Sequence, residues 1–566
     1  MAQIKGSSLF FVTSPRTPFK MRPEIDLLVR EFAGRRWVKN HKLQVEFMKQ
    51  LAKLPEFEGK YNQKDPDLSA RDRITRGPKA LGFVNLDRIA LTSAGENFLD
   101  GDLAEEALLR QLLKFQLPSP FHTANAKIAK SFCVRPYLEI IRLICTLGRL
   151  AFDELCLFGM QLTDWHEFNA IAEAVRQFRI RKESHKGRYK KFLYTERSQI
   201  VANVFAQEIS EGRIQTRESP DVSLEKFIRT KARNMRDYAD ACVRYLRATG
   251  LVTVSNPGRT ISIIESRRDE VEYILNTVNR DPVFVTNKIA YCEHLYNADT
   301  PVLLTDDRKT LEKKAVKSGG VVSEADAQTL NSNELKRCIR HAQEAQRAAI
   351  IDSQITELKA FAKYEEVIRV FKEIKSKDVY DPPLAFEWNA WRTMTMMDGG
   401  DIHANLIFDD VGNPLSTAPG NNADIVCDYG DFTVTVEVTL RSGNKQYDAE
   451  GEPVARHLGD IKAKTGKPAY CFFVAPTINP SSISHFYGLH RIPIKHYGGK
   501  SVVIPLTLDR FAGMLTQSKN CGFVPSPDKI RAFCEYSMSV ANTAEDEDEW
   551  YAAISRKADH WLEMGV

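Results

Sequence analysis

A predicted β-hairpin over residues 423–439 constrains this chain more than any other segment. Polar and apolar residues alternate on both sides of Gly430-Asp431, a two-residue turn of the Gly-X kind. Alternate strand residues share one face of a sheet, so centring the hairpin on this turn places Asp424 opposite Glu437. The expected pairs on that face are Asp428 with Thr433, Val426 with Thr435, and Asp424 with Glu437.

The other face of this hairpin is apolar, with the expected pairs Cys427/Val434, Ile425/Val436 and Ala423/Val438. Directly opposed side chains lie roughly 4.5–5.5 Å apart at Cβ, where like charges repel. A cation between Asp424 and Glu437 would turn that repulsion into binding, and hard oxygen ligands suit Mg²⁺. The alternative is a solvated hairpin that happens to carry two opposed acids.

The size and composition of the chain indicate an ordinary globular protein. Its 566 residues suggest roughly three or four domains at ~100–200 residues each. The net charge of +5 does not demand a nucleic-acid partner, so any basic surface must be local. The ten cysteines form no CxxC pair or zinc-type spacing, which predicts reduced thiols in a cytoplasmic protein. No signal-like apolar core or 18-residue apolar stretch occurs, so we expect no membrane association.

A helix followed by one or two short strands recurs in the first half of the chain. The pattern covers residues 69–99, 137–158 and 239–263, and the third copy ends its helix at Gly250. In the first copy, Thr92 or Ser93 is expected to cap the next helix. Helix plus β-wing is the winged variation on helix-turn-helix, which predicts DNA recognition. Such units also occur in α+β proteins that bind no DNA.

Basic residues gather near these patterns, most densely over residues 176–191, where aromatic residues interleave with them. Runs of this kind neutralise phosphates, although a charge run can also be a solvated helix face. The residues predicted to contact DNA are Arg71, Arg73, Arg76, Lys79, Arg179, Arg181, Lys182, Lys186, Arg188, Lys190, Arg233 and Arg236.

The second half of the chain divides into a helical part and a β-rich part. Long charged helices are expected over residues 324–346 and 355–375, and the β-rich pattern begins after Pro383. We therefore expect a multidomain α+β protein with four parts. These are a winged-helix-type recognition domain over 1–165, a second over 166–280, a helical linker domain over 281–380, and a catalytic domain over 381–566.

The order of elements in the last part resembles the PD-(D/E)XK nuclease core. A helix carries Glu387, the hairpin carries Asp424 and Glu437, and a polar helix then leads to a buried strand over 470–476. The resemblance implies an α/β nuclease domain with a mixed sheet. Two positions depart from the commonest pattern, since Ala423 replaces a proline and Thr439 replaces a lysine.

Four longer motifs are similar to the AlwI family of type IIS restriction and nicking endonucleases. They are Phe386-Glu387-Trp388, Pro419-Gly420-Asn421-Asn422-Ala423-Asp424, Val436-Glu437-Val438-Thr439-Leu440 and Glu452-Pro453-Val454-Ala455-Arg456-His457. The resemblance implies a catalytic site of Glu387, Asp424, Glu437, Glu450 and His457.

The chemistry of these residues agrees with that implication. Asp424 and Glu437 would hold Mg²⁺, Val438 could lend its carbonyl oxygen, and Glu387 could complete the shell. His457 is the candidate to activate water in place of the absent lysine, with a structural histidine as the alternative. Either Glu450 or Glu452 could join the site while the other pairs with Arg456, and Arg456 could also hold a phosphate oxygen.

We therefore expect a cytoplasmic Mg²⁺-dependent type IIS endonuclease that binds double-stranded DNA and cuts a short distance outside its recognition sequence. One active site per chain cuts one strand, so double-strand cleavage would need a transient homodimer through the nuclease domain or a second catalytic subunit. The alternatives are a winged-helix regulator with a non-catalytic nuclease-like domain and a non-specific DNA-repair nuclease.

Overall fold

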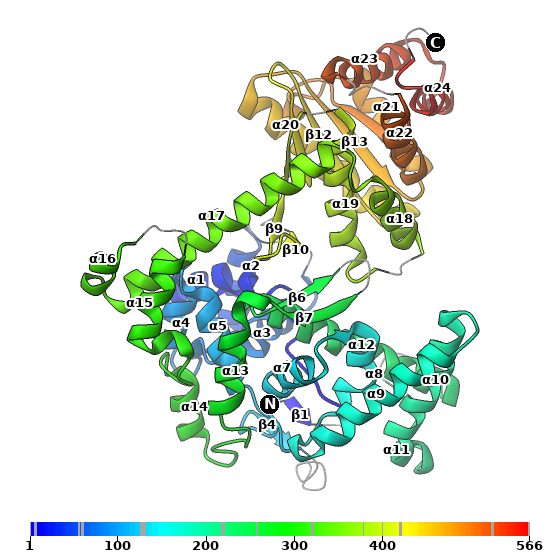
Figure 1. Cartoon of the computed structure of the whole chain (residues 1–566). Coiled ribbons are helices and arrows are strands. Elements are labelled where there is room, and N and C mark those ends of the chain that lie inside the picture. The colour runs from blue at the N-terminus through cyan, green and yellow to red at the C-terminus, as the bar shows by residue number, and fades with distance from the viewer. Residues whose placement is uncertain are drawn as a thin grey trace. The chain divides into compact units, whose positions relative to one another are not determined.

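The chain folds into two compact units, residues 1–346 and 347–566. The computed structural model describes residues 2–4, 8–54, 57, 61–124, 132–216, 221–255, 259–318, 322–376, 379–398, 400–417, 422–521 and 526–563. Helices dominate both units, and a mixed sheet forms the core of the second (Figure 1). The protein is therefore of mixed α+β class, as expected, whereas the division into four domains stays a prediction.

The first unit consists mainly of helices with short strands between them. Its helices are α1 (Met21–Phe32), α2 (His41–Leu51), α3 (Pro66–Arg76), α4 (Ser93–Leu99), α5 (Ala104–Lys114), α7 (Pro136–Leu147), α8 (Phe152–Leu157), α9 (Phe168–Ser184), α10 (Tyr189–Val204), α11 (Ala206–Ser210), α12 (Leu224–Arg247), α13 (Arg268–Thr277), α14 (Lys288–Tyr296), α15 (Arg308–Lys317) and α16 (Glu324–Thr329). Its strands are β1 (Ala2–Ile4), β2 (Val84–Asn85), β3 (Ala90–Leu91), β4 (His122–Ala124), β5 (Leu150–Ala151), β6 (Val252–Ser255) and β7 (Thr260–Ile263).

Local capping rules explain where several of these helices begin and end. Thr92 caps α4, because its hydroxyl accepts a hydrogen bond from the Gly95 amide at 3.0 Å, which confirms the first of the two expected caps. Gly250 follows α12 with a φ of +69°, a conformation that glycine adopts without steric cost. The strands expected after Gly250 are β6 and β7, and the turn expected at residues 256–258 lies outside the described residues.

The second and third helix–strand patterns share one sheet instead of forming two separate units. Strand β5 of the second pattern pairs with β7 of the third, so the sheet order is β5-β7-β6. Helix α8 also packs against α12. The second and third patterns therefore belong to one structural unit. Hydrogen bonding between strands more than 100 residues apart is a tertiary event that leaves no trace in either local pattern.

The helices expected over 324–346 and 355–375 have different bounds in the structure. The chain forms α16, then α17 (Ser332–Lys359), then α18 (Tyr364–Lys375). Asn331 and Glu334 start α17 with reciprocal caps, since each side chain accepts a hydrogen bond from the other residue's amide, at 3.0 and 2.6 Å. Phe361, with a φ of +56°, lies where the helical run is interrupted before α18.

The second unit is built on a five-stranded sheet of order β14-β13-β12-β11-β8. The strands of this sheet are β8 (Asp401–Ala404), β11 (Ile425–Asp428), β12 (Thr433–Val438), β13 (Ala469–Ala475) and β14 (Val502–Thr507). Two further strands, β9 (Leu406–Phe408) and β10 (Pro414–Thr417), pair with each other. After α18, its helices are α19 (Pro382–Asp398), α20 (Asn444–Thr465), α21 (Pro480–Arg491), α22 (Leu508–Asn520), α23 (Pro527–Thr543) and α24 (Glu547–Asp559).

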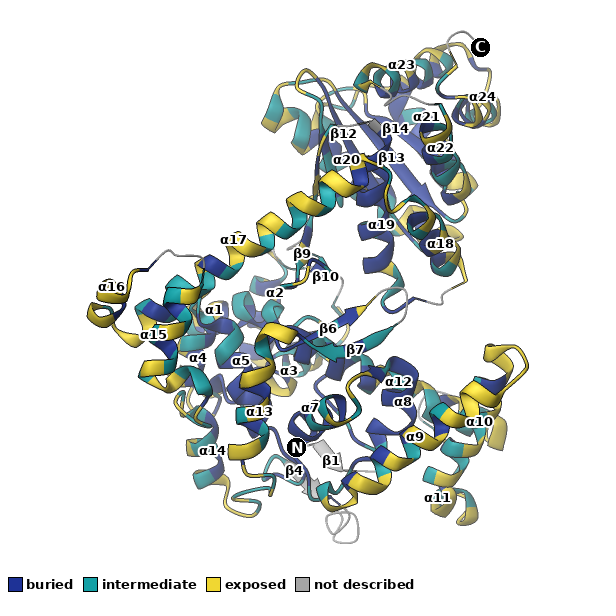
Figure 2. Ribbon diagram, in the orientation of Figure 1, coloured by how far each residue is buried: buried dark blue, intermediate teal, exposed yellow. Residues whose placement is uncertain are grey.

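The direction of the strands makes this sheet mixed. Strands β12, β13 and β14 run parallel, while β11 is antiparallel to both β12 and β8. Helices α19 and α22 pack together against the sheet, and so do α20 and α21. Every residue of β13 is buried, which confirms the buried strand expected near residues 470–476 and is visible in Figure 2.

A buried histidine in α21 links the stability of this second unit to pH. His490 is 1% exposed; its Nδ1 lies 2.9 Å from the Phe486 carbonyl oxygen and its Nε2 lies 3.2 Å from the Ser537 hydroxyl. Burial lowers the pKa of His490 from 6.5 to about 4. Between these values the unfolded chain binds a proton that the folded chain does not, so the free energy of unfolding falls as the pH falls.

We predict that His490→Gln reduces this pH dependence, because glutamine cannot take up the proton. The midpoint of chemical unfolding, measured near pH 7 and near pH 5, should fall less in the variant than in the parent protein. His496→Gln, at an exposed position five residues after α21 ends, is the matched control and should behave like the parent. An unchanged pH dependence in His490→Gln would contradict the assignment.

Candidate active site

The hairpin formed by β11 and β12 sets two acids against each other. Ile425 pairs with Val436, and the register continues through Asp428 with Thr433, as expected from the sequence. Tyr429 donates its amide hydrogen to the Phe432 carbonyl at 3.1 Å, which leaves Gly430 (φ +87°) and Asp431 as the two-residue turn. The predicted turn and register are thus confirmed.

Asp424 precedes β11 by one residue and therefore continues this register opposite Glu437 in β12. Its Oδ2 accepts a hydrogen bond from the Val438 amide at 2.8 Å, and its carbonyl accepts one from the Asn405 amide at 2.8 Å. Glu437 is 7% exposed and Asp424 is half-buried. The pairing of the backbone therefore fixes the positions from which the two carboxylates face each other.

The electrostatics of this pair favour a bound cation. Burial, followed by the nearby charge of Glu437, raises the pKa of Asp424 well above its usual value. Burial and then the charge of Glu450 raise the pKa of Glu437 in the same way, while Arg456 opposes the shift. Burial therefore penalises the charges of Asp424 and Glu437, and the repulsion among these two acids and Glu450 is only partly compensated.

Helix α20 contributes Glu450 to this region through a contact with Thr439, the residue that follows β12. The Thr439 hydroxyl lies 3.0 Å from Glu450 Oε1, and Arg441 Nε lies 3.3 Å from the same oxygen. Glu452 instead pairs with Arg456 at 3.3 Å and is largely exposed. Of the two glutamates that the sequence left open, the geometry therefore places Glu450 with the hairpin acids.

His457 lies on the same helix, and its ring contacts Glu437. Nδ1 is 2.8 Å from Glu437 Oε1, and both side chains are almost fully buried. Burial and the neighbouring charge of Arg456 lower the pKa of His457, which favours the neutral ring. Because Nδ1 is engaged by Glu437, only Nε2 is left for contact with a water molecule or a substrate.

Glu387 comes from a different element of the second unit. It is a half-buried residue of α19, the helix that packs against β11 and β12. Its place in a metal shell, like that of the Val438 carbonyl, stays a prediction.

The donors present fit a hard divalent cation. Asp424, Glu437 and Glu450 offer carboxylate oxygens, the ligands that Mg²⁺ prefers. Elsewhere in the described part of the chain, Cys133, Asp164 and His166 form a tighter group, because their ligand atoms all lie within 4.8 Å of one another. The three carboxylates at the hairpin are thus more widely spaced than that group, and an ion among them would draw them together or bind partly through water.

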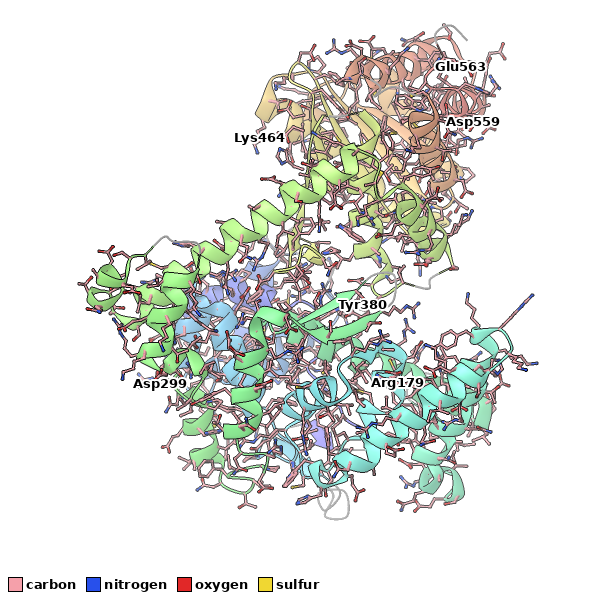
Figure 3. The ribbon with its side chains drawn as sticks, in the orientation of Figure 1. Arg179, Asp299, Tyr380, Lys464, Asp559 and Glu563 are labelled. Carbon is pink, nitrogen blue, oxygen red and sulfur yellow. The ribbon has the colours of Figure 1, made fainter. Side chains whose placement is uncertain are left out.

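The twelve residues predicted to contact DNA lie in the first unit and differ in how much charge they present. Arg179 (labelled in Figure 3) makes hydrogen bonds of 2.9 and 2.8 Å to the two carboxylate oxygens of Glu154. Arg181 does the same with Glu196 at 3.1 and 2.8 Å. A carboxylate neutralises each of these guanidinium groups, so they are poorer phosphate ligands than the sequence suggested.

The other ten fall into groups by their neighbours. Arg73 pairs with Glu24, Arg71 with Asp67, and Arg76 with Asp72. Lys79 and Lys182 lie over the rings of Phe121 and Tyr189, at 5.1 and 4.8 Å. The residues Lys186, Arg188 and Lys190 are exposed, in and just before the start of α10.

Arg233 and Arg236 line a cavity of about 690 Å³ between α8, α10 and α12. Arg197 and Arg229 line the same cavity. Arg197 escaped the sequence analysis because it lies six residues beyond the basic run over 176–191. Its position facing α12 is a product of helix packing.

Comparison with known protein families matches residues 79–514 to the AlwI restriction endonuclease family. The chain belongs to this family. The resemblance noted in the sequence is thereby confirmed, and the family is one of DNA nucleases.

Three solved structures are similar to this AlwI-family chain over nearly the whole of their own length. The small subunit R.BspD6I2 of the heterodimeric restriction endonuclease R.BspD6I is 29% identical, covering 35% of this chain and 95% of that one, with a TM-score of 0.29. The BpuJ1 endonuclease binding domain is 11% identical, covering 52% and 98%, with a TM-score of 0.34. Restriction endonuclease FokI is 11% identical, covering 93% and 98%, with a TM-score of 0.23.

No curated protein sequence matches this AlwI-family chain. None of the helices in the described residues combines the length and apolar character needed to cross a membrane.

We predict that Asp424→Asn stabilises the metal-free AlwI-family protein. The pKa of Asp424 is raised in the folded state, so ionisation of this carboxyl lowers the free energy of unfolding as the pH rises. Asparagine carries no charge, so the variant does not lose this stability. Near pH 8 the melting temperature should rise, by about 2–4 °C for each kcal/mol of repulsion relieved. Adding Mg²⁺ should then raise the melting temperature of the parent but not of the variant.

Asp428→Asn is the control for this effect, because Asp428 lies on the same hairpin but is paired with Lys467 at 3.3 Å. It should not raise the melting temperature. A lower melting temperature for Asp424→Asn at every pH would show that the acid pair does not strain the fold.

Proposed function

We propose that this chain is a Mg²⁺-dependent type IIS endonuclease that binds double-stranded DNA through its first unit and hydrolyses phosphodiester bonds with its second. The observation that carries the proposal is the opposition of Asp424 and Glu437 on one hairpin, with Glu450 and His457 brought to them by α20. Membership of a restriction endonuclease family supports the nuclease chemistry.

Asp424 and Glu437 would hold the metal, with Glu387 and Glu450 as further carboxylate ligands and a carbonyl oxygen from Val438. A bound Mg²⁺ supplies Lewis-acid polarisation of the phosphate and a water molecule of lowered pKa. Asp424 and Glu437 lie on one hairpin, so the backbone sets their spacing before an ion arrives.

His457 would take the proton of the attacking water at Nε2, while its Nδ1 stays bonded to Glu437. A hydrogen bond to one ring nitrogen orients the ring and fixes which tautomer the other presents. Arg456, next to it on α20, would bind a non-bridging oxygen of the scissile phosphate. Its present partner Glu452 is exposed and loosely held, so this exchange costs little.

Recognition would lie in the first unit, in winged-helix-type domains over 1–165 and 166–280 that share the sheet β5-β7-β6. A helical linker domain over 281–380 would lead from them to the nuclease domain. Lys186, Arg188 and Lys190 are exposed and are candidates for phosphate contact. Cleavage of both strands would need a second catalytic domain, through a transient homodimer or another subunit, because one site of this kind cuts one strand.

The test of this function is incubation of plasmid DNA with the full-length protein and Mg²⁺, followed by run-off sequencing of the product. A type IIS enzyme should leave ends at a constant offset from one asymmetric sequence. Nicked circles alone would indicate single-strand cutting, and random ends would indicate a nuclease without sequence specificity.

We predict that Asp424→Ala and Glu437→Ala each abolish plasmid cleavage but retain binding to target DNA in a gel-shift assay. Each removes a metal ligand and leaves the first unit intact. Asp428→Ala, on the same face of the same hairpin, is the matched control and should cut normally. Cleavage at parental rate by either of the first two variants would refute the assignment of the site.

A separate prediction concerns His457. If it accepts the proton of water, His457→Ala and His457→Gln should both cut about 10²–10⁴-fold more slowly, the usual range for loss of a general base. Glutamine can still donate a hydrogen bond to Glu437 but is no base. Near-parental cleavage by His457→Gln alone would instead make His457 a residue that positions Glu437.

A further inference from the structure

A cluster of three different ligand types lies in the first unit, in segments to which the nuclease chemistry assigns no role. Cys133, Asp164 and His166 each offer a ligand atom, and these atoms lie within 4.8 Å of one another. Cys133 and Asp164 are half-buried, and His166 is exposed. Thiolate, carboxylate and imidazole in one place form the donor set typical of Zn²⁺ and similar transition metals.

The backbone holds two of these three residues together. Cys133 and Asp164 form a parallel β-bridge, in which the Cys133 amide donates to the Thr163 carbonyl and the Trp165 amide donates to the Cys133 carbonyl, both at 3.0 Å. The positions of the sulfur and the carboxylate are therefore set by main-chain pairing across 31 residues of sequence. This resembles the way in which paired strands set the two acids of the candidate active site.

The third residue is fixed by the turn that follows. The Asp164 carboxylate caps the short helix Trp165–Glu167 by accepting a hydrogen bond from the His166 amide at 3.0 Å. His166 Nδ1 lies 2.7 Å from the same carboxylate oxygen, and its ring stacks on Trp165 with centroids 4.0 Å apart. The imidazole is thereby kept beside Asp164.

A second carboxylate increases the negative charge at this cluster. Asp281 Oδ1 lies 4.0 Å from Cys133 Sγ and accepts a hydrogen bond from the Trp165 indole at 2.9 Å. Arg135 is close to Asp281, but its guanidinium donates to the main-chain carbonyls of Asp281 and Leu113. A divalent cation would balance the two carboxylates.

We propose that Cys133, Asp164 and His166 form a binding site for Zn²⁺ or a transition metal of similar softness, distinct from the Mg²⁺ site of the nuclease unit. In a tetrahedral zinc site the ligand atoms stand roughly 3.3–3.8 Å apart, so the three atoms need to approach by at most about 1.5 Å. Rotation of the exposed His166 side chain and a small movement of the Asp164 carboxylate achieve this, replacing their direct contact with shared binding to the ion.

This site would join segments that are distant in sequence: residue 133, the turn 164–166 and, through its charge, Asp281 near the end of α13. It is independent of the proposed cleavage reaction, since Asp424 and Glu437 lie in the other unit. Mg²⁺ should not compete for it, because magnesium prefers oxygen ligands over sulfur and nitrogen.

The test uses full-length protein stripped of metal with a chelator and then titrated with Co²⁺ in the presence of excess Mg²⁺. A cobalt–thiolate site should produce a charge-transfer band in the near ultraviolet that saturates at about one ion per chain. The band should disappear in Cys133→Ser and persist in Cys145→Ser, a variant of another half-buried free cysteine in α7. Zn²⁺ should displace the cobalt and remove the band.

His166→Ala provides a second measurement that does not depend on how Cys133→Ser folds, because the His166 side chain is 59% exposed. It should weaken Co²⁺ and Zn²⁺ binding at least by the roughly 10–100-fold that loss of an outer-shell partner costs. Absence of the band in the parent protein, its survival in Cys133→Ser, or unchanged affinity in His166→Ala would each overturn the proposal.

Discussion

The backbone pairing of β11 with β12 is the interaction on which the candidate active site depends. Side chains alternate across a strand, so a slip of one residue in this pairing would move Glu437 to the apolar face and bury a carboxylate among core residues. The two-residue turn at Gly430-Asp431 and the apolar pairs such as Ile425 with Val436 oppose that slip together. The placement of the two acids is thus a consequence of sheet packing.

The same arrangement lowers the free energy of unfolding of the second unit through repulsion between carboxylates. Burial penalises the charges of Asp424 and Glu437, Glu450 adds a third negative charge beside them, and Arg456 compensates only in part. A hydrophobic core beneath the sheet, including a fully buried β13, supplies the stability that tolerates this repulsion. Sites that bind metal or substrate often carry such a cost, because the ligand removes it.

Helix α20 shows how one periodic element can present two sets of side chains to different surroundings. Glu450 and His457 are seven residues apart, which is close to two helical turns, so they lie on one face and meet Thr439 and Glu437. Glu452 and Arg456 are four residues apart on another side, where they pair near solvent. The helical period therefore separates the two glutamates that lie only two residues apart in sequence.

Local sequence determined the hairpin turn, its register, the buried strand β13 and the Thr92 cap, because each depends on neighbouring residues and on the alternation of apolar side chains. The family was also evident from short motifs around Glu387, Asp424, Glu437 and His457. Tertiary structure alone decided that β5 joins β7, that Glu154 neutralises Arg179 from 25 residues away, and that Cys133 lies beside Asp164. Those contacts join segments that are separated along the chain, and no local preference of either segment specifies its partner.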